Sequence, residues 1–292
     1  MWAKYIYMKT FAIFITLGWF LTETSFAQPG TVSLNKGQKF SIENKVSAVS
    51  NQEMMGQSME SKADFNTLSA VEVKDVKDNN FNITNNILHM KATMSAMGQE
   101  MGFDSDKKED LESTDKGIDL KSLINHPKDV VVDNTGKIIT PKTDALKKNP
   151  TDMSGMMMKQ LLGDNPNDGG FGLSGLFLNL PKNVAAGYSW TDSSSQGGIK
   201  KFTSYTVKEV KGSDAIVGIS GTMETDTQTE MQGVEISTKT KGKMKGEETV
   251  DTRSGVLKTR NTTLETSGVV SAQGMEIPMT SKITSLVSVK GS

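Results

Sequence analysis

The chain of 292 residues contains no cysteine, and this absence removes several kinds of chemistry at once. Without thiols there is no disulfide, thiolate nucleophile, cysteine zinc site or iron–sulfur cluster. Arginine is also scarce: Arg253 and Arg260 are the only two, so the positive charge is almost entirely lysine. Lysine lacks the planar fork that suits phosphates and base edges. With a net charge of −1 as well, we do not expect a nucleic-acid partner.

Aromatic residues make up 6% of the chain and hydrophobic residues 35%, and both fractions are low for a globular protein. We therefore expect thin sheets with solvated faces. The two histidines, His89 and His126, stand in no recognisable catalytic or metal-binding motif, and no glycine-rich phosphate loop occurs. A pair of catalytic carboxylates stays open, because the sequence does not show which acidic residues converge. An enzyme is not the expected class.

Residues 1–27 have the pattern of an export signal. Two lysines precede an apolar run over residues 11–21, and Ser25-Phe26-Ala27 forms a small-x-small cleavage site. We expect cleavage after Ala27 and a mature protein in the periplasm or outside the cell. The apolar run is shorter than the roughly 20 residues that a spanning helix needs, so no transmembrane segment is expected in the mature chain.

Strict alternation of apolar and polar residues dominates the rest of the chain. It holds for more than ten residues in 234–248 and again in 275–289, which predicts long strands with one solvated face. Three sequence anchors also recur in the same order in the two halves, which indicates an internal duplication. They are Gly37/Phe40 with Gly187/Trp190, Val73-Lys-Asp-Val-Lys77 with Val207-Lys-Glu-Val-Lys211, and Val132-Asp133 before Gly136 with Val250-Asp251 before Gly255.

These patterns predict a mainly β fold, with long antiparallel strands in a duplicated curved-sheet or half-barrel scaffold. A short helical insert is expected between the halves. The predicted organisation is a signal peptide (1–27), an N-terminal β repeat (28–140), a helical or loop insert (141–186) and a C-terminal β repeat (187–292). The sequence leaves open whether the halves form one continuous sheet or two subdomains.

The predicted insert carries two apolar stripes at helical spacing, the second ending at Pro181. Their apolar faces need cover, and the sheet is the nearest surface. We therefore expect a non-catalytic exported envelope protein, without a cofactor, that binds a hydrophobic small molecule or an apolar segment of an envelope protein between sheet and insert. The candidate ligand-binding residues are Met153, Met156, Met157, Leu161, Leu173, Leu176, Phe177 and Leu180.

The chain is rich in methionine, with 18 residues, and many of them fall at expected hairpin tips. Thioethers are soft ligands that suit Cu(I) where thiols are absent, so Met94, Met97 and Met101 form a candidate copper site. Methionine is also an adaptable filler of apolar gaps. A Met-based Cu(I)-binding protein is one alternative function, and a structural or surface-interaction module without a ligand is another.

Two charged features are interpreted as solvated surface. The lysines of 239–245 alternate on one face of an expected strand, where such a row often discourages edge-to-edge pairing. The acidic stretches 104–110 and 164–168 do not have the spacing of a known calcium loop.

Several short segments together resemble an uncharacterised family of exported bacterial proteins, known only as a domain of unknown function. The resemblance implies export and a β-rich repeat fold, and it brings no catalytic residues. The segments that carry it are the Met-Gly-Gln tips at 55–57 and 97–99, Phe103-Asp-Ser-Asp106, Val132-Asp-Asn-Thr-Gly-Lys-Ile138, Leu180-Pro181 before Gly187-Tyr-Ser-Trp190, Asp251-Thr-Arg-Ser-Gly255 and Met275-Glu-Ile-Pro-Met279.

Overall fold

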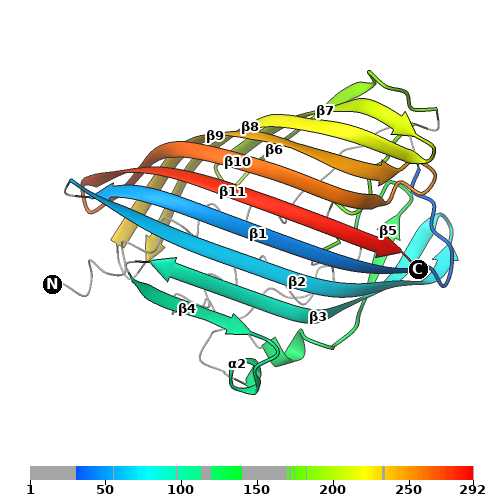
Figure 1. Ribbon diagram of the computed structural model, residues 1–292, viewed down its shortest axis with the longest axis horizontal. Helices are drawn as coiled ribbons and strands as arrows, with labels where there is room; N and C mark the ends of the chain where they lie inside the picture. Colours follow the sequence, from blue (N-terminus) through cyan, green and yellow to red (C-terminus); the bar gives the residue numbers. More distant parts are fainter. Residues whose placement is uncertain are drawn as a thin grey trace.

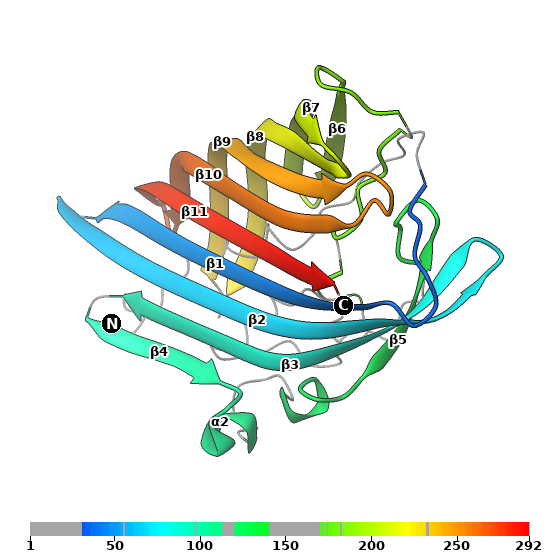
Figure 2. The ribbon, with the colours of Figure 1, turned by 45° about the vertical axis from the view of Figure 1, so that its right-hand side comes forward.

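The computed structural model describes residues 31–54, 56–96, 98–112, 120–139, 170, 172–173, 175–181, 183–231 and 234–291. These residues form one antiparallel sheet of 11 strands that curves into an open half-barrel (Figures 1 and 2). The predicted mainly β, curved-sheet scaffold is confirmed. The two halves of the chain join in a single continuous sheet.

The sheet brings the first and last long strands together at its middle. Its order is β4-β3-β2-β1-β11-β10-β9-β8-β7-β6, with β5 also paired to β3. Within the described residues β4 and β6 are its edges, and two short helices, α2 (Lys108–Glu112) and η2 (Leu120–Ser122), follow β4. The strands are β1 (Lys39–Met54), β2 (Gln57–Lys77), β3 (Asn80–Ala96), β4 (Gln99–Asp104), β5 (Lys128–Asp133), β6 (Ser189–Gln196), β7 (Ile199–Lys211), β8 (Asp214–Met231), β9 (Val234–Asp251), β10 (Leu257–Ala272) and β11 (Met275–Gly291).

Local sequence explains why the chain reverses where it does. Between β2 and β3 the turn residues Asp78 and Asn79 have φ angles of 53° and 61°, a left-handed conformation that Asp and Asn tolerate. Between β1 and β2 the reversal uses Gly56, with a φ of 74°. The pairing of the flanking strands makes both reversals hairpins.

The same hydrogen bonds anchor both halves, as the sequence repeat predicts. The N–H of Gly37 donates to the Val73 carbonyl at 2.8 Å, and the N–H of Gly187 donates to the Val207 carbonyl at the same distance. The strand pairing then shifts by one residue directly after each of these valines. The set β1, β2, β3 and β5 therefore matches the set β6, β7, β8 and β9.

Each half also contains an equivalent aspartate turn. Asp133 Oδ1 accepts two backbone hydrogen bonds, from Thr135 and Lys137, and Asp251 Oδ1 accepts two, from Arg253 and Ser254. Burial alone would raise the pKa of Asp251, but hydrogen bonds from the Arg253 side chain and from these backbone groups outweigh it and lower the pKa to about 2. At Asp133 the hydrogen bonds likewise outweigh burial, so the pKa of this residue also lies below its usual value.

Two of the glycines illustrate how closely neighbouring strands approach. A Cβ atom at Gly268 would lie 2.0 Å from the carbonyl oxygen of Lys239, and one at Gly221 would lie 2.4 Å from that of Phe202. Both contacts are with the backbone of an adjacent strand, which cannot rotate away as a side chain can. Glycine is therefore required at both places, and the tight coiling of the sheet depends on it.

The expected helix at the end of the insert is wrong. Gly172, Leu173 and Gly175 lie in turns, and Phe177 then pairs with Val256 in an isolated antiparallel bridge. The backbone hydrogen bonds that a helix would use internally go to the β9–β10 connection instead, with Leu178 N–H donating to Gly255 O at 2.8 Å. The expected helix over Met153–Leu161 lies outside the described residues. In the described part of the chain, the structure has no helix with the length and apolar character needed to span a bilayer.

Candidate functional site

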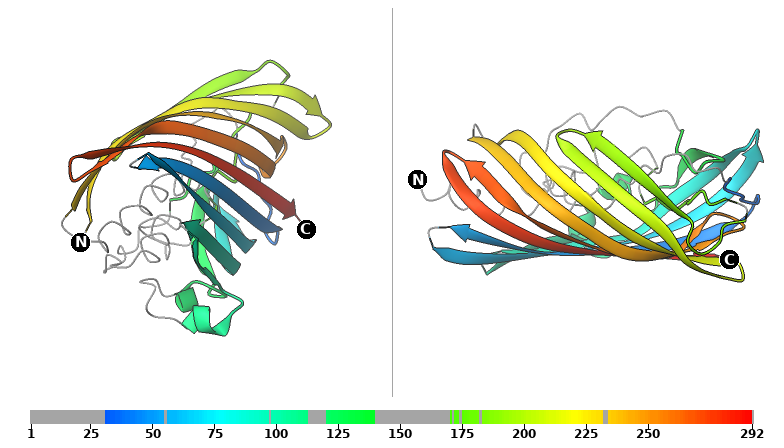
Figure 3. Two further views of the ribbon diagram at one scale, coloured as in Figure 1. Left: turned by 60° about the vertical axis from the view of Figure 1, so that its left-hand side comes forward. Right: turned by 90° about the horizontal axis from the view of Figure 1, so that it is seen from above.

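The alternation of side chains along each strand gives the half-barrel a buried inner face and a solvated outer face, and Figure 3 shows its curvature from two further sides. Aligned positions on neighbouring strands form rows across the inner face. One row is apolar and well buried over most of its length, and it joins β2 to β8 through the strands between them. Its members are Ala63, Ala48, Ile283, Leu264, Met244 and Gly221.

The next row towards the hairpin tips consists of small, mostly hydroxyl-bearing residues: Ser61, Ser50, Ser281, Thr266 and Gly242. The hydroxyls of Thr266 and Ser281 are hydrogen-bonded to each other at 2.7 Å. This row lies between the main core and a smaller apolar group beside the hairpin tips, which we call the tip cluster. The tip cluster consists of Ile236, Val270, Ala272, Ile277 and Met279, with Met59 and Met275 packed against it.

Gln52 occupies the inner face at the edge of the tip cluster. It lies directly opposite Met59 on β2 and Met279 on β11, and it is only 3% exposed. Neither the nitrogen nor the oxygen of its amide has a hydrogen-bond partner. Leaving such a group unsatisfied costs about 1–3 kcal/mol. Gln52 is thus a buried polar group with its whole hydrogen-bonding capacity unused.

Other buried polar atoms share this condition. The hydroxyl of Thr238, in β9, and the side-chain oxygen of Asn44, in β1, have no hydrogen-bond partner. Both amide atoms of Asn179 are in the same state. Buried polar groups in native proteins are nearly always hydrogen-bonded, to protein or to ordered water. The inner face therefore offers hydrogen bonds at several places that the chain itself does not fill.

The second apolar stripe of the predicted insert closes the end of the half-barrel opposite the tips. Its four residues, Leu173, Leu176, Phe177 and Leu180, are each at most 5% exposed and belong to the main core. They cover the start of β10, where Leu257 N–H donates to Leu176 O at 2.8 Å. The structure brings these four predicted site residues together as packing. Met153, Met156, Met157 and Leu161 lie outside the described residues.

A buried ion pair fastens this closing segment to the sheet. Arg260 Nε donates to Glu248 Oε2 at 2.8 Å, and Arg260 Nη2 donates to the carbonyl oxygen of Gly175 at 2.9 Å. The same arginine therefore links β9, β10 and residues 175–178. Arg260 and Glu248 fall in the apolar phase of their strands, and this placement is a sequence signal for a buried ion pair.

The predicted copper ligands are partly brought together. Met94 on β3 lies directly opposite Met101 on β4, with Met94 buried and Met101 half-buried. Met97 lies outside the described residues. Two thioethers on adjacent strands suit a soft metal ion and equally suit apolar packing.

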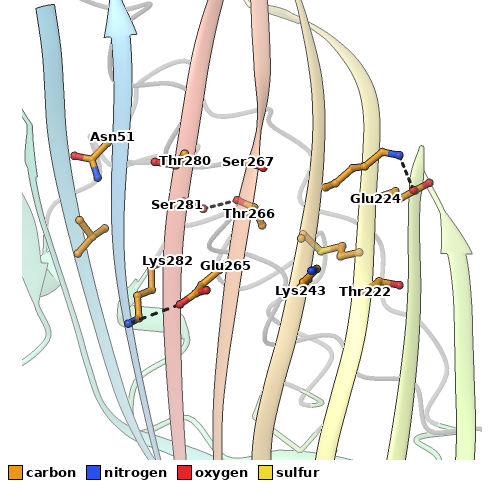
Figure 4. A pocket seen from close by; sticks show the side chains of 14 residues that line it. Asn51, Thr222, Glu224, Lys243, Glu265, Thr266, Ser267, Thr280, Ser281 and Lys282 are labelled. Atoms are coloured by element: carbon orange, nitrogen blue, oxygen red, sulfur yellow. Dashed lines mark hydrogen bonds and ion pairs between the residues drawn. The ribbon is translucent and has the colours of Figure 1, made fainter.

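The outer face holds a depression of about 850 Å³ that crosses β1, β11, β10, β9 and β8 (Figure 4). Two exposed ion pairs cross it, Glu224–Lys241 at 3.2 Å and Glu265–Lys282 at 3.9 Å. Exposed pairs of this kind contribute at most about 1 kcal/mol each. Its lining combines hydroxyl, lysine and glutamate groups with apolar surface, including that of Val49.

The lysine row of 239–245 belongs to this outer face. These lysines are exposed, as expected of a solvated face. The expectation that the row guards a sheet edge is wrong, because β9 is paired on one side with β8 and on the other with β10. A strand inside the sheet has no free edge to protect.

His89, Asp104 and Asp106 form a cluster that the sequence did not suggest. His89 Nδ1 lies 3.1 Å from Asp106 Oδ1, and Lys91 Nζ lies 3.2 Å from Asp104 Oδ2. Burial raises the pKa of Asp104, but hydrogen bonds from Asp106 N–H and Lys91 outweigh burial and leave the pKa below its usual value. The nearby lysine already supplies the positive charge that this carboxylate needs.

One protein-family model matches residues 78–257, which is more than half of the chain. The chain belongs to DUF6263, a family of unknown function. The match runs from the turn between β2 and β3 to the start of β10. The predicted resemblance to an uncharacterised domain family is thereby confirmed, and DUF6263 brings no assigned activity. No curated protein matches this DUF6263 chain.

Solved structures with some likeness to this DUF6263 protein are large β proteins. One is described as showing lipid–protein interactions in lipovitellin, with 11% identity and a TM-score of 0.42; the match covers 88% of this chain and 26% of that one. An outer membrane channel from Pseudomonas putida F1 has 10% identity, a TM-score of 0.25 and coverage of 91% and 100%. OpdQ from Pseudomonas aeruginosa has 7% identity, a TM-score of 0.28 and coverage of 88% and 100%. The chain thus spans about a quarter of lipovitellin, and with TM-scores below 0.5 no functional argument rests on these likenesses.

Proposed function

We propose that this protein is a non-catalytic, exported envelope protein that binds an apolar molecule against the inner face of its half-barrel. The observation that carries the proposal is the combination on that face of apolar rows, small side chains and buried polar atoms without partners. Small-molecule sites are mostly apolar, with a few polar groups that fix orientation. The inner face has this composition.

The shape of the scaffold supports the same function. Residues 173–180 and the Arg260–Glu248 pair close one end of the half-barrel, so a ligand would enter from the side or from the tip end. The tip end carries Met59, Met275 and Met279, whose flexible thioether side chains adapt to different apolar surfaces. The closing segment thus has a structural role, and ligand contact moves to the centre and tip end of the inner face.

A matched pair of substitutions tests this placement. Ala48 lies on the inner face beside Ala63, whereas its neighbour Val49 lies on the outer face. Ala48→Phe adds an aromatic ring to the inner face and should weaken binding of a fluorescent fatty acid by at least tenfold. Val49→Phe adds the same ring outside and should leave binding unchanged. Circular dichroism and urea unfolding check that both variants are folded, because overpacking a buried site typically costs about 1–3 kcal/mol.

Two results would count against the proposal. The first is wild-type protein that binds neither fluorescent fatty acids nor hydrophobic dyes. The second is equal binding by folded Ala48→Phe and Val49→Phe, since that result would move the site away from the inner face.

A second candidate function is Cu(I) binding, favoured by the position of Met94 directly opposite Met101. Titration against a Cu(I) chelator should then show one bound ion. Replacing Met94, Met97 and Met101 by leucine keeps the apolar packing and removes the thioethers, so it should abolish that binding. Unchanged affinity in the triple variant would exclude this site.

A further inference from the structure

The amide of Gln52 marks where a polar group of a ligand would lie. An amide side chain has two N–H donors and one acceptor oxygen, so an ideal partner both accepts and donates hydrogen bonds. Hydroxyl and amide groups do both. Within the described residues no atom fills this role at Gln52, although the side chain is almost completely buried.

The surroundings of Gln52 determine which charge the partner can carry. The residues opposite it are Met59 and Met279, and the row beside it consists of small uncharged residues from Ser61 to Gly242. A charged group placed there would lose its hydration without gaining a counter-ion, which costs several kcal/mol. The site therefore suits an uncharged polar group.

The only fully buried ion pair on the described inner face is too distant to help. Arg260 and Glu248 lie in the row of Asn44, which is eight residues from Gln52 along β1. At about 3.4 Å per residue, the two rows are about 27 Å apart. Arg260 is also already engaged by Glu248 and by the Gly175 carbonyl.

We infer that Gln52 recognises the head group of the ligand, and that the ligand is an uncharged amphiphile with a hydroxyl or amide head group. This inference rests on the proposed function. The apolar part of the molecule would extend from Gln52 towards the core along Ser50 and Ala48, which are 1% and 2% exposed, so binding would exchange their present cover for the ligand. Met59 and Met279 flank the head group and exclude water from it.

Three probes with the same acyl chain separate the possibilities: oleamide, 1-monooleoylglycerol and oleate, measured at pH 8 where oleate is ionised. Wild-type protein should bind the first two at least tenfold more tightly than oleate. Gln52→Met keeps the length of the side chain and removes its hydrogen-bonding groups. It should weaken oleamide and monooleoylglycerol binding about tenfold and leave oleate binding unchanged.

A control and a stability measurement make the test decisive. Gln228→Met, an exposed position on β8, should not change the binding of any probe. Unliganded Gln52→Met should be at least as resistant to urea as wild-type protein, because it removes an unsatisfied buried amide. Wild-type binding of all three probes with equal affinity, or unchanged oleamide binding in Gln52→Met, would overturn the assignment of Gln52 and leave the proposed function standing. Failure of wild type to bind any probe would overturn both.

Discussion

Replacing Arg260 by methionine is expected to destabilise the protein by about 3–5 kcal/mol. The Arg260 side chain is 8% exposed and its partner Glu248 is 0% exposed, so the substitution leaves a carboxylate inside the sheet without its counter-charge. It also removes the hydrogen bond to the Gly175 carbonyl, which holds the closing segment. The free energy of unfolding of a typical native protein is only about 5–15 kcal/mol, so a loss of this size is readily measured.

A double variant separates the charge effect from the packing effect. Replacing both partners, as in Arg260→Met with Glu248→Leu, leaves no buried charge, and such replacements are often neutral or stabilising. The double variant should therefore recover most of the stability that the single variant loses. Lys241→Met removes one partner of an exposed ion pair and serves as the control, with an expected change within about 0.5 kcal/mol.

Urea denaturation at pH 7.5, followed by circular dichroism, measures all four proteins. Hydrogen exchange at the Leu178 amide reports on the closing segment, because this N–H donates to Gly255 O. The amide should exchange faster in Arg260→Met than in wild-type protein. A loss below about 1 kcal/mol in Arg260→Met, or a double variant no more stable than Arg260→Met, would refute the reasoning.

Two further predictions follow from single sites. Gly268→Ala should lower the free energy of unfolding in urea by about 1–3 kcal/mol, because the new methyl group would lie 2.0 Å from the Lys239 carbonyl oxygen. Gly291→Ala is the control and should be nearly neutral, because its methyl group would have no contact closer than 3.9 Å. Asp251 has a folded-state pKa of about 2, below its ordinary value of 3.8. Its ionised form therefore stabilises the folded protein above pH 4 by about 2 kcal/mol, and this contribution is lost as the pH falls from 4 to 2. Asp251→Asn should flatten the stability curve over that interval, and an unchanged curve would contradict this interpretation.

Long-range sequence alternation predicted much of the fold. Residues 234–248 and 275–289 lie in β9 and β11, because period-two patterns of that length fit only a strand with one buried face. The repeat anchors were also informative, since Gly37 and Gly187 make the same hydrogen bonds. The pairing of β1 with β11 could not be predicted in this way, because it joins residues more than 200 positions apart and no local pattern encodes it.

The candidate site shows where sequence reasoning stops. Leu173, Leu176, Phe177 and Leu180 have helical spacing, yet their backbone pairs with the β9–β10 connection, and spacing alone cannot reveal that competition. Gln52 could have been noticed, because it shares the phase of the buried residues Phe40, Ile42 and Val46 on β1. The lack of a hydrogen-bond partner for Gln52 could not have been predicted, because it depends on which side chains the neighbouring strands place opposite this residue.

Native mass spectrometry of the protein purified from its own host tests the central claim most directly. We expect a mass above that of the polypeptide alone, with the excess lost on extraction with organic solvent and recovered as an uncharged amphiphile. A clean mass of the unliganded chain, together with no uptake of oleamide or fluorescent fatty acid, would contradict it.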